Sequence, residues 1–103
     1  MIFHLTEPAR WERSLAEGVH TGSTRGIELA DEGFIHCSSA EQWPAVRERF
    51  YADVDELLLL HVDETLVDCP VVWEQLGDAP AEFPHLYGPL PLAAVVRVEE
   101  LRR

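Results

Sequence analysis

The segment from Gly33 to Ser39 places a histidine and hydroxyl groups among apolar residues, a combination that could support chemistry. Successive side chains of a β-strand alternate between two faces, so His36 and Ser38 would share one face while Ile35 and Cys37 share the other. Histidine titrates near neutral pH and can act as an acid, a base or a hydrogen-bond donor, and a nearby hydroxyl can hold a ligand oxygen. The alternative is a core histidine bonded to the main chain, with Ser38 as a helix cap.

Two other segments carry groups of the same kind. His4 and Thr6 share one face of a predicted opening strand, which repeats the pairing of an imidazole with a hydroxyl. His85 and Tyr87 lie in a segment rich in proline and glycine, Phe83 to Leu90, and ligand-binding residues concentrate in such loops. The alternative for both pairs is structural: a half-exposed histidine at the end of a strand, and two rings that anchor a loop.

Glu74 is predicted on a strand among apolar neighbours, in the segment Val71 to Leu76. A carboxylate buried without a partner is costly, so Glu74 lies either at a sheet edge or in a polar pocket. An acid beside an imidazole on a sheet face can activate a hydroxyl or stabilise a cationic intermediate. The predicted catalytic residues are therefore His36, Glu74 and His85, and the predicted ligand-binding residues are His4, Thr6, Ser38 and Tyr87.

The composition excludes several other chemistries. All eight basic residues are arginine, so no lysine side chain is available for Schiff-base formation. No cysteine or histidine repeats at the spacing of a zinc site, so we predict no metal, and we expect Cys37 and Cys69 to be free thiols. His20 and His61 are interpreted as structural. Neither the serine motif of α/β-hydrolases nor a glycine-rich phosphate loop is present.

The formal net charge of −11 disfavours non-specific binding to nucleic acid, because the long-range field of the protein repels phosphate. No apolar run approaches the roughly 18 residues of a membrane-spanning helix. The segment Met1 to Leu5 lacks the basic residues of a signal peptide. We therefore expect a cytoplasmic protein without membrane attachment. Its expected partner is a small-molecule or nucleotide-like ligand.

At 103 residues the chain is predicted to form a single domain, residues 1–103, with two helices. The first begins near Pro8, which suits a first helical turn, and ends at Gly18. The second ends near Phe50 and is expected to begin at Pro44, because a proline inside a helix costs about 3 kcal/mol. Between the helices, Val19 to Asp31 shows no period and contains a polar loop.

The remaining segments predict a sheet. Leu57 to Val62 is almost entirely apolar, the pattern of a central strand covered on both faces. Gly77 to Pro91 holds four of the seven prolines and is predicted to be a loop that folds over the sheet as a lid. Ala93 to Val98 is the last predicted strand, and Glu99 to Arg103 a polar tail. This order predicts an α+β domain with two helices packed on a small mixed or antiparallel sheet.

Four motifs, taken in order, resemble those of one family: the opening strand with His4, the run from Gly33 to Ser38, Trp73 with Glu74, and Phe83 to Leu90. Over nearly its whole length the sequence resembles the domain-of-unknown-function family numbered 952. That resemblance implies an ADP-ribosyltransferase-like fold, with a split mixed sheet and a cleft shaped for a nicotinamide dinucleotide.

The resemblance also implies roles for individual residues. His4 with Thr6 resembles the element of the wider ADP-ribosyltransferase group that holds the ribose or pyrophosphate. Ser38 resembles the element that frames the nicotinamide, and Glu74 resembles the late glutamate that orients the attacking group. NAD would then be a substrate rather than a resident cofactor.

Three functions remain open from the sequence. The first is a histidine-lined cleft that binds a nucleotide-like or NAD-like ligand, with ADP-ribosyl or phosphate transfer. The second is a non-catalytic binding or interaction module in which Phe83 to Leu90 contacts a partner protein. The third is a small-molecule hydrolase or isomerase that uses a histidine and Glu74 as acid and base.

Overall fold

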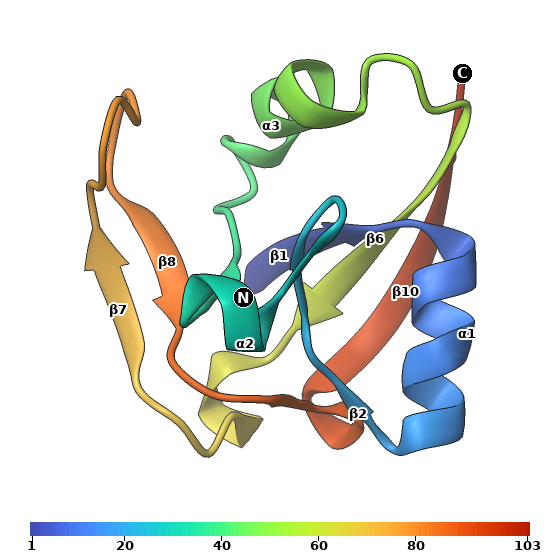
Figure 1. Cartoon of the computed structure of the whole chain (residues 1–103), viewed down its shortest axis with the longest axis vertical. Coiled ribbons are helices and arrows are strands. Elements are labelled where there is room, and N and C mark those ends of the chain that lie inside the picture. Colours follow the sequence, from blue (N-terminus) through green and yellow to red (C-terminus); the bar gives the residue numbers. More distant parts are fainter.

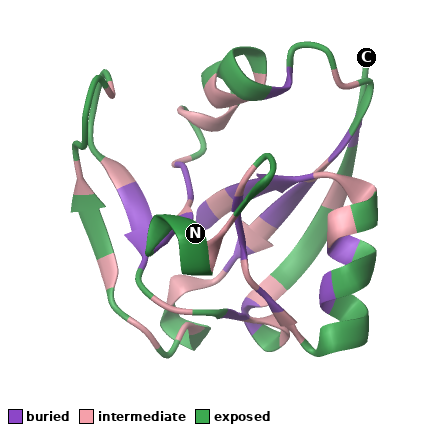
Figure 2. Cartoon of the chain, viewed as in Figure 1, coloured by how far each residue is buried: buried purple, intermediate pink, exposed green.

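The apolar strand β6 (Glu56–Val62) lies at the centre of a three-stranded antiparallel sheet, as its sequence predicts (Figure 1). In the computed structural model, which describes residues 1–103, β1 (Ile2–Thr6) pairs with one side of β6 and β10 (Val95–Arg102) with the other. Burial is concentrated in β1 and β6, whereas β10 is largely exposed (Figure 2). The outer strands therefore protect β6 on both edges.

Two apolar clusters cover the two faces of this sheet. Leu60 and Val62 belong to the larger cluster, and Leu57 and Leu59 to the smaller one. This division follows from the alternation of side chains along β6. Full burial of one leucine side chain contributes about 1.5–3 kcal/mol, so both faces add to stability.

The two predicted helices, α1 (Pro8–Glu17) and α3 (Trp43–Tyr51), cover opposite faces of the sheet. Trp11 of α1 joins the larger apolar cluster, whereas Trp43 of α3 packs against the smaller one. Proline stands in the first turn of each helix, where its missing N–H group leaves no hydrogen bond unmade. Gly18 ends α1 in the left-handed conformation, with φ 82°.

A second antiparallel sheet holds most of the predicted site residues. It consists of β5 (Ile35–His36), β8 (Phe83–Leu86) and β7 (Val71–Glu74), with β8 in the middle. Phe3 and Ser38 join this sheet to the first one, since each donates its amide to the carbonyl of the other, at 2.8 and 2.7 Å. This bridge fixes the end of β5 beside the start of β1.

Two short sheets complete the fold, and all pairings are antiparallel. The α+β class is confirmed, but a third helix is present and no mixed sheet forms. None of the helices has the length and hydrophobicity to cross a lipid bilayer.

The remaining elements are short. The first short sheet pairs β2 (Val19–His20) with β9 (Leu90–Pro91), and the second pairs β3 (Gly22–Thr24) with β4 (Ile27–Glu28). The third helix is α2 (Leu29–Glu32), and 3-10 turns lie at Glu64–Leu66 and Leu92–Ala94.

Two predictions about the end of the chain are wrong. The lid predicted over Gly77 to Pro91 contains β8, the middle strand of the second sheet. Pro84 obscured this strand, yet it removes only one donor, and its carbonyl still accepts from the amide of Cys37 at 3.0 Å. The tail predicted over Glu99 to Arg103 is mostly part of β10, which is an edge strand with one solvated face and so tolerates charged residues.

The segment from Val19 to Asp31, which shows no period in the sequence, contains three short strands and most of the helix α2. Its strands are only two or three residues long, too short to show a hydrophobic period. The helix α2 is held by a capping box, in which Glu28 and Asp31 each bond to the backbone of the other. A pair of two acidic residues lacks the serine or threonine of the usual capping-box pattern, so the sequence does not reveal this cap.

Candidate functional site

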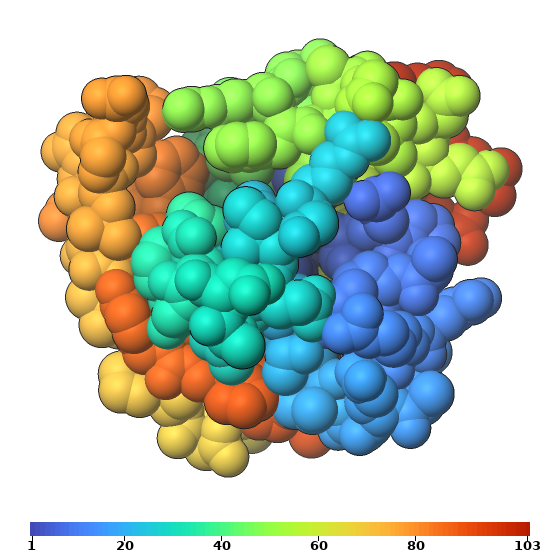
Figure 3. All heavy atoms as spheres, in the orientation of Figure 1, coloured from blue at the N-terminus to red at the C-terminus, as the bar shows by residue number.

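A mostly apolar cavity of about 220 Å³ lies between α3, β5, β8 and the turn that joins β7 to β8. In the space-filling view a hollow opens between α3, the segment around α2 and the β7–β8 hairpin (Figure 3). His4, His36, Ser38 and His85 all line the cavity. The structure therefore brings together histidines from three strands that are distant in sequence.

His85 is backed by a carboxylate. Its Nδ1 lies 2.8 Å from Oε2 of Glu74, and the hydroxyl of Tyr87 donates to the same oxygen. Because an ionised carboxylate only accepts, Nδ1 of His85 carries the proton and Nε2 has a free lone pair. No protein group is bonded to this Nε2, although His85 itself is only 3% exposed and lines the cavity.

Glu74 is suited to accept the hydrogen bond from Nδ1 of His85, because its carboxylate stays ionised. The hydrogen bonds from Tyr87 and His85 hold the pKa of Glu74 below its usual value. A carboxylate that fixes the tautomer of an imidazole, and leaves its other nitrogen free, is the arrangement of a general base. Glu74 lies on β7, an edge strand of the second sheet, and its carboxylate is also held by two polar partners, so the two positions that the sequence allowed occur together.

His36 stands next to this pair. Its ring centroid lies 4.9 Å from that of His85, edge on, and Phe34 stacks on His85 with the centroids 4.1 Å apart. Burial and the neighbouring His85 lower the pKa of His36, while Glu32, at 3.5 Å from Nε2, opposes that shift. His36 is therefore a second imidazole, uncharged at neutral pH, on the same wall.

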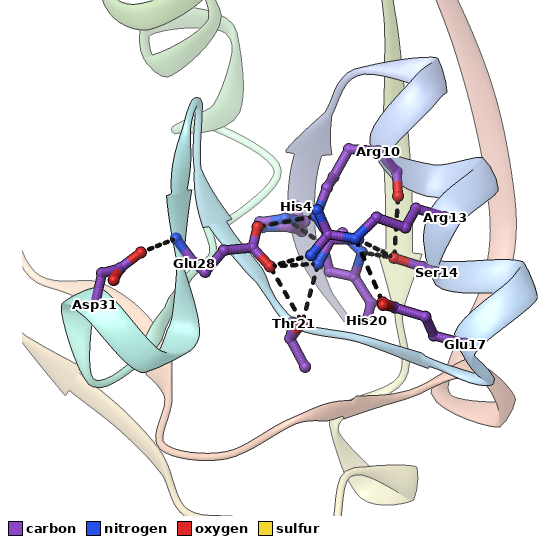
Figure 4. Close-up of polar contacts among 9 residues, drawn as sticks. All are labelled: His4, Arg10, Arg13, Ser14, Glu17, His20, Thr21, Glu28 and Asp31. Carbon is purple, nitrogen blue, oxygen red and sulfur yellow. Dashed lines mark hydrogen bonds and ion pairs between the residues drawn. The ribbon is translucent and has the colours of Figure 1, made fainter.

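His4 lines the cavity, but both of its ring nitrogens are occupied, one of them by His20 (Figure 4). Nδ1 lies 2.6 Å from the carbonyl oxygen of His36, and Nε2 lies 3.0 Å from Nε2 of His20. A carbonyl can only accept, so Nδ1 of His4 donates and its Nε2 accepts from His20. Nδ1 of His20 then accepts from the hydroxyl of Ser14, at 2.7 Å.

This series of bonds keeps both imidazoles neutral. Burial lowers the pKa of His4 to about 4 and that of His20 to about 2. Because the series ends on a carbonyl, which cannot pass a proton on, it is not a proton relay. Its effect is structural: the side chain of His4 satisfies the carbonyl of His36 and holds β5 in place.

The other end of the series is an ion-paired cluster (Figure 4). Arg10 donates to Ser14 at 2.8 Å and to both carboxylate oxygens of Glu28, at 2.9 and 2.8 Å. Arg13 donates to the same Glu28 at 2.8 Å. The bonds from Arg10 lower the pKa of Glu28, so these charges remain paired at neutral pH.

A second, polar recess of about 450 Å³ lies beside the cavity and shares His4 and Tyr51 with it. Arg10, Arg13 and Arg25 line this recess. Each of the three already holds a carboxylate: Glu28 for the first two and Asp53 for Arg25.

The remaining predicted site residues lie at other places. Glu74 and Tyr87 stand behind His85 rather than on the cavity wall, and Thr6 lines the polar recess. The hydroxyl of Ser38 has no partner in the protein and lines the cavity.

Sequence reasoning missed Arg49 and Tyr51, which both line the cavity from α3. Helical spacing could have indicated Arg49. It follows Val46 by three residues and precedes Phe50, which puts it at the border of the apolar face of that helix.

No metal site is evident among the side chains. No three residues among His, Cys, Asp and Glu converge in a way that could hold a metal ion. Cys37 and Cys69 are free thiols, and burial raises the pKa of Cys37 far above its usual value. Cys37 is therefore a core residue and a poor nucleophile.

The fold and the cavity define a small α+β protein with an imidazole-lined pocket between two antiparallel sheets. The chain belongs to the family described as "Protein of unknown function (DUF952)", whose model matches residues 5–98, so the predicted family is confirmed. No curated protein matches the chain.

Solved structures support the same assignment. The chain is similar to protein CC0527 from Caulobacter crescentus, whose crystal structure shares 30% sequence identity with a TM-score of 0.82. That match covers 96% of this chain and 83% of CC0527. The solution NMR structure of CC0527 matches with 31% identity and a TM-score of 0.78, over 98% and 84% of the two chains.

Proposed function

We propose that the protein is an enzyme that binds a small organic molecule in the cavity and uses the Glu74–His85 pair as a general base. The observation that carries this proposal is the free Nε2 of His85 on the cavity wall, with its Nδ1 held by Glu74 at 2.8 Å. The reaction class is hydrolysis or isomerisation, in which a base removes a proton from water or from the ligand.

The neighbouring residues assist this step. Nε2 of His85 takes the proton, and Glu74 stabilises the imidazolium that forms. His36 stays neutral and donates a hydrogen bond to the ligand, and the unpaired hydroxyl of Ser38 binds a ligand oxygen. The apolar walls exclude water, which strengthens each of these electrostatic interactions.

Turnover of a panel of small metabolites tests this proposal. Replacing His85 by glutamine should lower the rate of any reaction found by about 10²- to 10⁴-fold, the usual contribution of a general base. His61→Gln is the matched control, because His61 lies on the first sheet, paired with Glu99. Equal turnover by His85→Gln and the wild type, with both proteins folded by circular dichroism, would contradict the proposal.

A nucleotide-like or NAD-like ligand, with ADP-ribosyl or phosphate transfer, is the second candidate. It is favoured by the polar recess, because a flat base in the cavity would direct its phosphates past His4 toward the recess arginines. This candidate function assumes an ADP-ribosyltransferase-like fold, in which Glu74 would orient the attacking group. It ranks second because phosphate would have to displace Glu28 or Asp53 from those arginines.

Thermal-shift titration separates the two candidates. A ligand that binds only the native state stabilises it by about 2.7 kcal/mol at 100 times its Kd, so NAD, ADP-ribose or AMP should raise the Tm. An unchanged Tm with all three ligands would contradict the nucleotide-like candidate, and only the acid–base proposal would remain.

The non-catalytic alternative, in which Phe83 to Leu90 contacts a partner protein, is less favoured. Pro84, His85 and Leu86 are buried and leave little of that segment for a partner. In each case we place the protein in the cytoplasm, where thiols stay reduced.

A further inference from the structure

Arg49 is the arginine on the cavity wall, and it has no acidic partner. It lies in the last turn of α3 and lines the cavity beside Val46 and Phe50. Arg49 is exposed, as is Phe50 beside it, so its guanidinium lies at the solvent-reachable side of the cavity wall. The recess arginines Arg10 and Arg25, by contrast, each hold a carboxylate.

The guanidinium of Arg49 is held without using its hydrogen-bond donors. Its Cζ lies 5.2 Å from the ring centroid of Phe50, a cation–π contact that attracts the charge through the ring face. No hydrogen bond or ion pair occupies the N–H groups of Arg49, so all five donors are free. A planar guanidinium with free donors is suited to bind a carboxylate or a phosphate through two parallel bonds.

The rest of the cavity limits the shape and charge of what it can hold. Its walls are mostly apolar, and its volume of 220 Å³ is that of about seven waters, which suits a small molecule. Asp78, on the turn between β7 and β8, is the other charged residue of the lining besides Arg49. Since Asp78 would repel an anion, a negative group of the ligand is directed to the α3 side.

We infer that the ligand of the cavity is a small, largely apolar molecule with one oxyanion group, a carboxylate or a phosphate, and that Arg49 binds this group. This inference rests on the proposed function, which makes the cavity the substrate site. It adds the class of substrate and a residue that determines specificity. The negative net charge of the protein makes such a local cation necessary, because the overall field repels anions.

Three naphthalene compounds of matched size test the inference. Titration of labelled protein with 2-naphthoate, 2-naphthyl phosphate and the neutral 2-naphthamide would be followed by NMR at amides of cavity residues. The wild type should bind at least one of the anions about tenfold more tightly than the amide, since bonds to charged groups are the stronger ones. The anion that is preferred identifies the oxyanion as carboxylate or phosphate.

Variants assign this preference to one side chain. Arg49→Gln should reduce the preference for the anion to less than about twofold while 2-naphthamide binds as before, and Arg49→Lys should retain part of it. Arg97→Gln is the matched control, because Arg97 is an exposed arginine of β10 away from the cavity, and it should bind all three compounds like the wild type.

The outcomes separate this inference from the proposed function. Equal affinity for the amide and both anions, or a preference that survives in Arg49→Gln, would overturn the role of Arg49 and leave the acid–base site intact. If none of the three compounds shifts the cavity amides at millimolar concentration, both are overturned, since a cavity that admits no apolar ring is not the proposed substrate site.

Discussion

Mild acid should destabilise this protein through His4 and His20, before its carboxylates are protonated. In the unfolded chain each histidine has a pKa near 6.5, whereas in the native state burial lowers these pKa values to about 4 and about 2. Between pH 6.5 and about 4, the unfolded state therefore binds two protons that the native state does not. The free energy of unfolding must fall as the pH falls through this window.

The magnitude follows from the same values. One proton of difference changes the free energy of unfolding by about 1.36 kcal/mol per pH unit. From pH 7.5 to pH 5, each of the two histidines should cost about 2 kcal/mol, or about 4 kcal/mol together. Glu28, whose pKa is lowered by Arg10, loses its stabilising effect only as the pH falls below 4.5, so the loss down to pH 5 comes from histidines, and the lowered pKa of His36 adds to it in the same direction.

Urea denaturation at pH 7.5 and at pH 5 measures the effect. His20→Gln keeps a group that can donate to His4 and accept from Ser14 but does not titrate, so this variant should lose about 2 kcal/mol less stability in acid than the wild type. His61→Gln removes a histidine outside the series and serves as the control. Stability that is equal at the two pH values, or a pH dependence reduced alike in both variants, would refute the reasoning.

Three further predictions concern packing and the hydrogen bonds of the site. Leu60→Ala should lower the free energy of unfolding by about 2–5 kcal/mol in urea, since Leu60 is fully buried, and a loss below 1 kcal/mol would contradict its place in the core. Tyr87→Phe removes a hydrogen bond to Glu74 and should raise the pKa of that carboxyl, measured by carbon NMR. An unchanged value would show that Tyr87 does not support it. Gly88→Ala should cost about 1–3 kcal/mol, because a Cβ there would lie 2.6 Å from Cβ of Cys69. An equally stable alanine variant would contradict that close approach.

Local patterns in the sequence predicted the elements that have one clear period. The alternation along Ile35 to Ser38 predicted that Ile35 and Cys37 share one face, and both belong to the larger apolar cluster, whereas His36 and Ser38 line the cavity, which Cys37 also borders. The apolar run of β6 and the proline starts of the two helices were equally informative. These features depend on neighbours in the chain, which is why a single sequence reveals them.

Features that depend on pairing between distant segments were not predictable. Glu74 reaches His85 because β7 and β8 pair with Val72 opposite His85, and this register is not encoded in either segment alone. The pairing of Arg10 with Glu28 likewise needs α1 to lie beside β4. The strand β8 is not evident from the sequence because Pro84 and the prolines on either side of the strand resemble those of a loop.

The place of His85 on a strand that is flanked on both sides has a consequence for how the cavity can change. His85 cannot shift without breaking a sheet, whereas the facing wall is made of one helix, α3, and the turn between β7 and β8. Adaptation to ligands of different size must therefore take place in that wall, both in thermal motion and over evolutionary time. Relatives with altered selectivity should differ at α3 and the turn, and should keep the same chemistry on β8.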